Sequence, residues 1–349
     1  MNITTQVFES FSVDALWLHK SVNVRYQSGF TGDDTDAFIS NGRRCLLTDA
    51  RYIEQAKAEC PDWEAVDHHG KLTDALAACC HRQGIRRLGI EMRAVTAAQY
   101  VELQKALPDV ELIDADTDRL RQIKTEEEIT AIRHACEIGD RALQDILPLI
   151  RSGVTEHVLR AELERAMLAH GSEQTAFTTI VASGYRSAMP HGIASDKVVE
   201  DGNFITFDFG AVYHGYHSDM TRTFVVGKAT ERQRHLYHAV LRAQEAACKM
   251  IRPGMAGSEP DQTVRDMLKQ DGLETYFSHS LGHSVGLEIH EGPNLSPRET
   301  RTLAEGMVVT VEPGVYIAGF GGLRIEDTTV VREDGLQLLT QFPKELVEL

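Results

Sequence analysis

Residues 204–226, FITFDFGAVYHGYHSDMTRTFVV, read as two strands joined by a tight turn at residues 213–215. Asp208 lies late in the first apolar run and Asp219 lies early in the second, so the midpoint between them falls beside the turn. The pattern therefore predicts that the two acids face each other across an antiparallel hairpin. Facing carboxylates destabilise a sheet unless a proton or a cation lies between them, which predicts a divalent metal here.

The chain from residue 125 onward contains the same order of predicted elements twice. A long amphipathic helix over 125–150 precedes a shorter one over 156–169, and the order recurs with helices over 230–250 and 262–269. An Ile-Arg-x-Gly break follows the long helix in both halves. Each helix pair is followed by strands that carry acids. The repeated order predicts an internal duplication.

The acids of the two halves keep a nearly constant separation in the sequence. Glu312 lies 104 residues after Asp208, and Glu326 lies 107 residues after Asp219. The surroundings are apolar, as in ITFDFG and VVTVEPG, where an unpaired carboxylate is costly. We therefore expect a pseudo-twofold fold that brings the four carboxylates to one metal centre. A solvated hairpin face is the alternative for any one of these acids taken alone.

The segment 278–291, SHSLGHSVGLEIHE, supplies three histidines among glycines. A carboxylate cluster needs a softer ligand to favour a transition metal over magnesium. His283 is the candidate ligand, because the glycine before it allows close backbone approach. His279 and His290 are expected to contact substrate or to handle protons.

His191 and Arg324 lie close in sequence to the predicted ligands. His191 precedes Asp208 by 17 residues, and a histidine packed in a loop is the alternative interpretation. Arg324 is expected to share a strand face with Glu326, because strand side chains alternate. A buried arginine beside the cluster orients a ligand carboxylate or binds a substrate carbonyl, with an ordinary strand salt bridge as the alternative.

Residues 1–121 alternate short apolar runs with helical patterns, which favours a small α/β layer domain. The polar stretch 114–122 lacks an apolar period and marks the predicted boundary with a second domain over 122–349. The turn-rich stretch 23–32 is expected to be a loop, either packed on the domain core or forming the rim of a substrate pocket. Strands are expected over 15–18, 37–39, 44–47 and 87–90, and helices over 50–59 and 72–83.

The composition of the 349-residue chain is that of an ordinary globular protein. Its 36 basic and 52 acidic residues give a formal charge of −16, which argues against nucleic acid or an anionic membrane as a partner. The six cysteines show no CxxC spacing, and no signal peptide or membrane span is predicted. We therefore expect a cytoplasmic protein with reduced thiols.

Five segments together resemble the signature of the pita-bread metallopeptidases, peptidase family M24, in their proline-peptidase branch. That branch includes Xaa-Pro aminopeptidases and Xaa-Pro dipeptidases (prolidases). The resemblance spans essentially the whole chain and implies an α+β fold, in which a creatinase-like α/β N-terminal domain precedes a pita-bread domain with a pseudo-twofold repeat. The segments are PHGIASD (190–196), FDFGAVYHGYHSDMTRT (207–223), HSLGHSVGLEIHE (279–291), VVTVEPGVY (308–316) and GLRIEDT (322–328).

The resemblance implies two divalent metal ions, Mn²⁺ or Co²⁺ with Zn²⁺ as an alternative. Asp219 and Glu326 would bridge the ions, Asp208 would complete one site, and His283 and Glu312 would complete the other. A hydroxide held between the two ions would attack the peptide bond.

The resemblance also implies roles for the groups around the ions. Glu312 would handle the proton of the attacking water. His191 and His290 would position the scissile bond and stabilise the tetrahedral intermediate. His279 and Arg324 would help to build the pocket for proline and its carbonyl.

We predict an aminopeptidase that hydrolyses the bond between an N-terminal residue and a following proline or small residue in small peptides. An Xaa-Pro dipeptidase that cleaves dipeptides only is the alternative. The short separation of Glu312 from Glu326 favours the aminopeptidase, because it leaves little room for a loop that reads a free C-terminus. A non-catalytic peptide-binding module and a metal-free creatinase-like hydrolase are further alternatives, although the complete ligand set argues against both.

Relatives in this branch imply a homodimer, in which the N-terminal domain of one subunit caps the site of the other. Residues 25–30 are the expected cap. Tyr26, within this stretch, is therefore expected to contact substrate.

Overall fold

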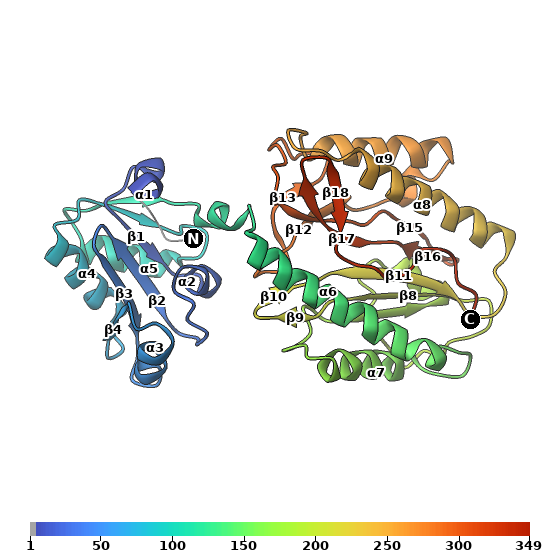
Figure 1. Cartoon of the computed structure of the whole chain (residues 1–349), viewed down its shortest axis with the longest axis horizontal. Coiled ribbons are helices and arrows are strands. Elements are labelled where there is room, and N and C mark those ends of the chain that lie inside the picture. The colour runs from blue at the N-terminus through green and yellow to red at the C-terminus, as the bar shows by residue number, and fades with distance from the viewer. Residues whose placement is uncertain (1–4) are drawn as a thin grey trace. The chain divides into compact units, whose positions relative to one another are not determined.

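The computed structural model describes residues 5–349, and the chain divides into two compact units. Unit 1 ends at Arg121 and unit 2 begins at Gln122 (Figure 1). Within the described residues, no helix has the length and apolar character needed to cross a membrane. All six cysteines are free thiols, and five of them are buried.

Unit 1 is built around a six-stranded sheet with the strand order β4-β3-β2-β1-β5-β6. The pairs β1-β5, β5-β6 and β3-β4 are parallel, whereas β1-β2 and β2-β3 are antiparallel. Helices alternate with the strands, which confirms the expected α/β layer design. The strands are β1 (Ala15–Leu18), β2 (Asp36–Ser40), β3 (Arg43–Thr48), β4 (Glu64–Asp67), β5 (Arg87–Ile90) and β6 (Glu111–Asp114). The helices are α1 (Thr5–Phe11), α2 (Ser21–Ser28), α3 (Ile53–Glu59), α4 (Leu72–Gln83) and α5 (Ala97–Ala106).

The expected loop over 23–32 is wrong for most of its length, because helix α2 occupies Ser21–Ser28. The helix ends at Gly29, which has a φ of 81° and donates its N–H to Arg25. Glycine takes this left-handed conformation without steric cost, so the turn signal in the sequence marks the end of a helix. The Tyr26 hydroxyl donates to the Leu120 carbonyl within unit 1 at 2.9 Å.

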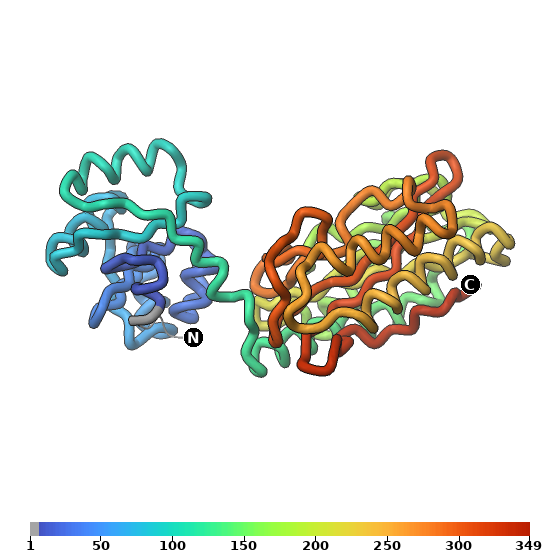
Figure 2. Tube along the Cα trace, turned by 90° about the horizontal axis from the view of Figure 1, so that it is seen from above, coloured from blue at the N-terminus to red at the C-terminus, as the bar shows by residue number. Residues whose placement is uncertain are grey.

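Unit 2 repeats one arrangement of two helices and several strands. Helices α6 (Glu126–Ile146) and α7 (Glu156–Ala169) lie on one side of the strands, and α8 (Glu231–Met250) and α9 (Ser258–Gln270) lie on the other (Figure 1, Figure 2). The pair α8–α9 packs its apolar face mainly on strands of its own half, and α7 does the same in the first half. Helix α6 packs on both halves, because Ile129, Ile132 and Cys136 near its start contact apolar residues of the second half. The predicted duplication is therefore visible in the fold.

The two long helices start with the same local device. Thr125 caps α6 by accepting from the N–H of Glu128, whose carboxylate accepts in return from the Thr125 N–H. Thr230 and Gln233 form the equivalent capping box at α8, 105 residues later. Each box satisfies backbone N–H groups that the first helical turn leaves without partners.

The strands of unit 2 form one main sheet in each half. The first half has the order β11-β8-β7 and the second has β13-β12-β14-β17-β18, while β9-β10 and β15-β16 are short two-stranded ribbons. The first-half strands are β7 (Ile180–Ser183), β8 (Phe204–Phe209), β9 (Val212–Tyr213), β10 (Tyr216–His217) and β11 (Met220–Val225). The second-half strands are β12 (Gly282–Ser284), β13 (Glu291–Leu295), β14 (Val308–Val311), β15 (Gly314–Ile317), β16 (Gly321–Arg324), β17 (Asp327–Arg332) and β18 (Gly335–Leu338).

The register of the first hairpin differs from the predicted one by two residues. Asp208 pairs with Thr221, and Asp219 directly precedes β11, so the two acids are not directly opposite. The turn consists of His214 and Gly215, which have φ values of 51° and 79°. Two residues with positive φ make the turn that matches the strand twist, and its centre lies one residue beyond the predicted midpoint.

The second hairpin does place its acids opposite each other. Val311 pairs with Asp327 and Gly314 pairs with Arg324, so the same register brings position 312 opposite position 326. The two hairpins are therefore related in design but differ in how their acids meet.

Candidate metal centre

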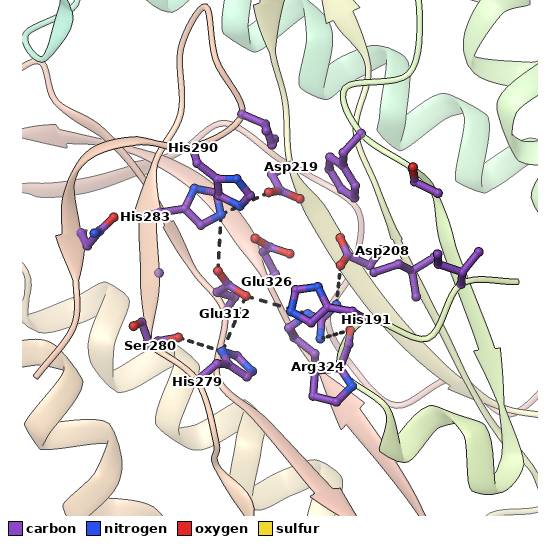
Figure 3. Close-up of a pocket in the computed structure, with 18 residues that line it drawn as sticks. His191, Asp208, Asp219, His279, Ser280, His283, His290, Glu312, Arg324 and Glu326 are labelled. Carbon is purple, nitrogen blue, oxygen red and sulfur yellow. Dashed lines mark hydrogen bonds and ion pairs between the residues drawn. The ribbon is translucent and has the colours of Figure 1, made fainter. Parts of the chain in front are cut away.

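Five candidate ligands reach one cavity of about 540 Å³ in unit 2 (Figure 3). Asp208 lies within β8, and Asp219 directly precedes β11. His283 is the middle residue of β12, Glu312 directly follows β14, and Glu326 directly precedes β17. The structure thus brings together all five side chains that the sequence proposed as ligands, from both halves of the duplication.

Three of these side chains are arranged closely enough to share an ion. Asp219, His283 and Glu326 each offer one donor atom, and these atoms lie within 4.8 Å of one another. His283 Nε2 lies 3.5 Å from Asp219 Oδ2 and 3.5 Å from Glu312 Oε1. The other ring nitrogen of His283 lies 3.1 Å from the Ser284 carbonyl. A proton on Nδ1 would be held there, which leaves Nε2 free to bind a cation.

Two carboxylate oxygens in the cluster lack any partner in the protein. Asp219 Oδ1 and Glu326 Oε1 are buried and make no hydrogen bond, and the two residues are 5% and 1% exposed. Burial, reinforced by the neighbouring carboxylates, raises the pKa of both groups well above the usual range. Unpartnered buried carboxylates are costly unless a proton or cation compensates them. Carboxylate oxygens with one imidazole therefore fit a divalent metal.

Arg324 is held against Asp208 and lines the same cavity as Glu326. The Thr221 hydroxyl links Arg324 to Glu326, because it accepts from the arginine and donates to the glutamate. Arg324 Nη2 donates to Asp208, its Nε donates to the Thr221 hydroxyl at 3.0 Å, and its Nη1 donates to the Tyr316 hydroxyl at 2.6 Å. The guanidinium comes from the second half and Asp208 from the first, so this bond joins the two halves inside the cavity.

His279 lies at the wall of the cavity beside Tyr316. Its Nε2 is 2.9 Å from the Tyr316 hydroxyl, and its Nδ1 is 2.8 Å from the Ser280 carbonyl. Burial and the nearby Arg324 charge lower the pKa of His279 to about 3. His279 is therefore neutral at neutral pH and serves as a hydrogen-bonding group, whereas burial raises the pKa of Tyr316 to about 12.

His290 and His191 line the cavity from different sides (Figure 3). The His290 ring packs against the His283 ring with 4.4 Å between centroids, and burial lowers the pKa of His290. His191 reaches the cavity from the segment between β7 and β8, on the side of Asp208. Tyr26 lies in unit 1, and its contact with substrate stays a prediction.

Sequence reasoning missed Tyr316 and Thr221. Tyr316 joins His279 to Arg324, and the Thr221 hydroxyl donates to Glu326 Oε2 at 2.6 Å. No local pattern in the sequence points to Tyr316, because its partners His279 and Arg324 come from other segments of the chain. Thr221 lies directly opposite Asp208, so its place could be predicted only with the correct register.

The duplicated fold with a buried cluster of acids and one imidazole defines the class as a protein with a candidate divalent-metal site, and the comparisons with known proteins assign it to the metal-dependent hydrolases. The sequence model of metallopeptidase family M24 matches residues 130–333, and that of the creatinase/prolidase N-terminal domain matches residues 5–123. The chain belongs to metallopeptidase family M24. The predicted family, the two-part fold and the assignment as a metallopeptidase are thereby confirmed.

Similar proteins span the whole length of the chain. The Xaa-Pro dipeptidase of Pyrococcus furiosus is 40% identical over 340 residues, which is 96% of each chain. A structure of the Xaa-Pro dipeptidase from Bacillus anthracis is 42% identical, covers 99% of this chain and 97% of its own, and has a TM-score of 0.95. A structure of the X-Pro aminopeptidase from Thermotoga maritima is 38% identical, covers 99% and 100%, and has a TM-score of 0.91.

Proposed function

We propose that this chain is an Xaa-Pro dipeptidase, or prolidase, that uses two divalent metal ions. The observation that carries the proposal is the convergence of four carboxylates and one imidazole in one cavity, with two carboxylate oxygens left unpartnered. The dipeptide substrate is supported by the names of the relatives from Pyrococcus furiosus and Bacillus anthracis. The aminopeptidase predicted from the sequence becomes the second candidate.

The proposed holders of the two ions are the five predicted ligands Asp208, Asp219, His283, Glu312 and Glu326. Asp219 and Glu326 are the proposed shared ligands, because each has an oxygen with no partner in the protein. Divalent ions supply Lewis acidity and an activated water when bound to such a site. Mn²⁺ or Co²⁺ suits this set of oxygens with one imidazole, and Zn²⁺ is the alternative.

Glu312 is the proposed carrier of the proton during hydrolysis. Burial raises the pKa of its carboxyl group, and Glu312 Oε2 lies 3.9 Å from the Arg324 guanidinium. A carboxylate with a raised pKa takes a proton from water and returns it to the leaving nitrogen of proline more readily than an ordinary one.

The remaining polar side chains are proposed to orient the substrate. His191 and His290 would donate to the scissile carbonyl and to the negative charge that develops on its oxygen. His279 in its neutral form, together with Tyr316 and the charged Arg324, would form the polar wall of the proline pocket. The apolar side chains that line the same cavity suit the proline ring, and they are Phe177, Ile180, Pro190, Ile193 and Ile289.

One feature of the cavity favours the aminopeptidase. Arg324 is the one lysine or arginine among the described residues that line the cavity, and Asp208, Thr221 and Tyr316 already accept from it. A free dipeptide carboxylate is usually met by such a cation. The second candidate is therefore an aminopeptidase that also accepts longer Xaa-Pro peptides.

Substrate length and metal dependence are tested together. Protein freed of metal with EDTA is reconstituted with Mn²⁺, Co²⁺ or Zn²⁺ and assayed on Ala-Pro, Ala-Pro-Ala and longer peptides. We expect no hydrolysis without metal and a kcat/KM for Ala-Pro at least about 10-fold above that for Ala-Pro-Ala, a difference of about 1.4 kcal/mol. Equal or faster tripeptide cleavage would establish the aminopeptidase. No cleavage with any metal would favour a peptide-binding module.

A homodimer in the cytoplasm, with residues 25–30 of one subunit capping the site of the other, stays a prediction. The proposed dipeptidase does not depend on it, because all five candidate metal ligands come from unit 2 of a single chain.

A further inference from the structure

Two fully buried acids occupy equivalent places in the two halves of unit 2. Glu156 is the first residue of α7, and Asp261 is the fourth residue of α9. The acids lie 105 residues apart, close to the offsets of 104 and 107 residues between the candidate metal ligands. Among the described residues they are the only acidic side chains with no exposed surface. Neither acid lines the cavity, so neither belongs to the metal centre itself.

Glu156 holds both ends of the segment that carries His191. Its Oε1 accepts from the Ser183 N–H at 2.7 Å and the Ser183 hydroxyl at 2.9 Å. Its Oε2 accepts from the Ser195 N–H at 3.1 Å and the Ser195 hydroxyl at 2.7 Å. Arg186 donates to the same oxygen at 3.0 Å and to the Ile193 carbonyl at 2.6 Å. One carboxylate thus closes the segment from residue 183 to residue 195.

Asp261 does the same for the segment that carries His279. Its Oδ1 accepts from the Leu281 N–H at 3.0 Å, and its Oδ2 accepts from Arg265 at 2.7 Å. Arg265 in turn donates to the His279 carbonyl at 2.7 Å and to the Phe277 carbonyl at 3.2 Å. The Leu281 carbonyl accepts from the backbone N–H of Glu312 at 2.9 Å, so the clamped segment also touches a predicted ligand.

We infer that Glu156 and Asp261 are positioning residues that form a duplicated clamp. Each acid lies outside the cavity and fixes the backbone of a segment that carries a cavity histidine, His191 for Glu156 and His279 for Asp261. The two acids come from helices on opposite sides of the strands (Figure 1). In both halves an arginine pairs with the acid and donates to a backbone carbonyl of the histidine segment. Buried carboxylates that accept from several donors hold the backbone in one arrangement, because any shift leaves a buried polar group unsatisfied. The inference rests on the proposed function, since it assigns His191 and His279 to the substrate.

The variants Glu156→Gln and Asp261→Asn test the clamp with almost no change in volume. In Glu156→Gln the new amide NH₂ faces a backbone N–H in either orientation, because one carboxylate oxygen accepts from the Ser183 N–H and the other from the Ser195 N–H. In Asp261→Asn it faces either the Leu281 N–H or the Arg265 guanidinium, so one donor loses its acceptor and the segment must move. We expect kcat/KM for Ala-Pro to fall by about 10- to 100-fold, the loss that small misplacements of substrate-orienting groups cause. Metal content should stay unchanged. Amide hydrogen exchange at Ser183 and Ser195, or at Leu281, should become faster, and this readout does not depend on activity.

Asp140→Asn is the matched control, because Asp140 also accepts from two backbone N–H groups, those of Gln341 and Phe342 at 2.9 and 3.0 Å. It does not line the cavity. We expect its thermal midpoint to fall about as far as in the clamp variants while kcat/KM stays unchanged. An equal loss of activity in Asp140→Asn would mean that the clamp variants act through general destabilisation, and it would overturn the inference.

Double-mutant cycles separate positioning from a structural role. If Glu156 acts through His191, then Glu156→Gln should cost nothing further in a His191→Ala background, and Asp261→Asn should cost nothing further in His279→Ala. Additive losses would overturn the clamp while leaving the proposed function intact. No loss from His191→Ala and His279→Ala alone would instead contradict the proposed roles of these histidines, and the inference would fall with them.

Discussion

Asp219 is a proposed shared metal ligand, and its burial among like charges should make it costly to the stability of the metal-free protein. It lies 5% exposed among like charges, with Oδ1 unpartnered. Asp219→Asn removes that charge at nearly constant volume. We expect metal affinity to fall by at least about 100-fold. Residues that only hydrogen-bond to metal ligands already change metal affinity by about 10- to 100-fold when they are mutated, and loss of a ligand should cost at least as much. The metal-free variant should be more stable than the metal-free parent by about 1 kcal/mol. Metal analysis and urea unfolding of both proteins in EDTA measure the two effects.

The opposite signs of these effects make the prediction specific. If Asp219 had only a structural role, Asp219→Asn would lower the free energy of unfolding both with and without metal. A variant that keeps two equivalents of metal and full activity contradicts the assignment of Asp219 as a shared ligand. Thr263→Val is the control, because Thr263 is a half-buried residue of α9 whose hydroxyl donates to the Glu259 carbonyl and which does not line the cavity. Thr263→Val should change neither the metal content nor the difference in the free energy of unfolding between the metal-bound and the metal-free protein.

At the residue scale, the candidate metal ligands could be predicted from the sequence, whereas the residues that hydrogen-bond to them could not. The ligand set follows from acids in apolar runs at repeated offsets, which are local features of the chain. The bond from Arg324 to Asp208 spans 116 residues and joins two halves, so no local pattern reveals it. Tyr316 could not be predicted for the same reason. Its hydroxyl contacts His279 and Arg324 only when the second hairpin and the histidine segment lie together in the fold.

At the element scale, the pairing of β1 with β2 contains a pH-dependent contact. His19, which follows β1, places Nδ1 2.6 Å from Asp36 in β2, and Trp17 donates to the same oxygen at 2.8 Å. The hydrogen bond to Asp36 raises the pKa of His19 above its ordinary value of 6.5. The stabilisation is therefore complete below the unfolded pKa and is lost as the pH rises through the folded pKa. We expect His19→Gln to cost about 1 kcal/mol more at about pH 5.5 than at about pH 9.

Urea unfolding followed by tryptophan fluorescence measures this difference in unit 1, because both tryptophans, Trp17 and Trp63, lie there. His69→Asn is the control within unit 1, because the His69 side chain is 81% exposed and lies 3.2 Å from its partner Asp67. Exposed ion pairs contribute little, so the control should change stability by less than about 0.5 kcal/mol at either pH. An equal cost of His19→Gln at both pH values would show that the contact does not depend on a charged imidazole.

The two elements that the sequence mispredicted fail for identifiable reasons. Helix α2 looked like a loop because of its polar residues, but buried Asn23 donates to Glu91 at 2.6 Å and accepts from Arg121 at 2.7 Å. Those partners lie 68 and 98 residues away in sequence, beyond the reach of local propensity. The first hairpin was shifted by two residues because His214 takes a positive φ, which a histidine rarely does. By contrast, the long helices were predictable because capping boxes and amphipathic periods are local.

At the scale of the whole molecule, the candidate ligands tie the two halves of unit 2 together. Asp208 and Asp219 come from the first half, and His283, Glu312 and Glu326 come from the second. Metal bound by these proposed ligands would replace electrostatic repulsion between the halves with attraction. A ligand that binds only the folded state stabilises it by about 2.7 kcal/mol at 100 times its Kd. For a unit of this size that corresponds to about 5–10 °C in the thermal midpoint.

We therefore expect saturating Mn²⁺ or Co²⁺ to raise the midpoint of the circular-dichroism melt by about 5–10 °C over the EDTA-treated protein. Asp219→Asn should abolish this shift, because the shared ligand is gone. Asp140→Asn should melt earlier than the parent but keep the full shift, because its carboxylate binds the C-terminal segment and not the metal. The contrary outcome is a parent protein that needs metal for hydrolysis but whose thermal midpoint does not change when metal is added. That outcome would place the ions at a weaker site than this cluster, because metal bound tightly by ligands from both halves must stabilise the packing of the two halves.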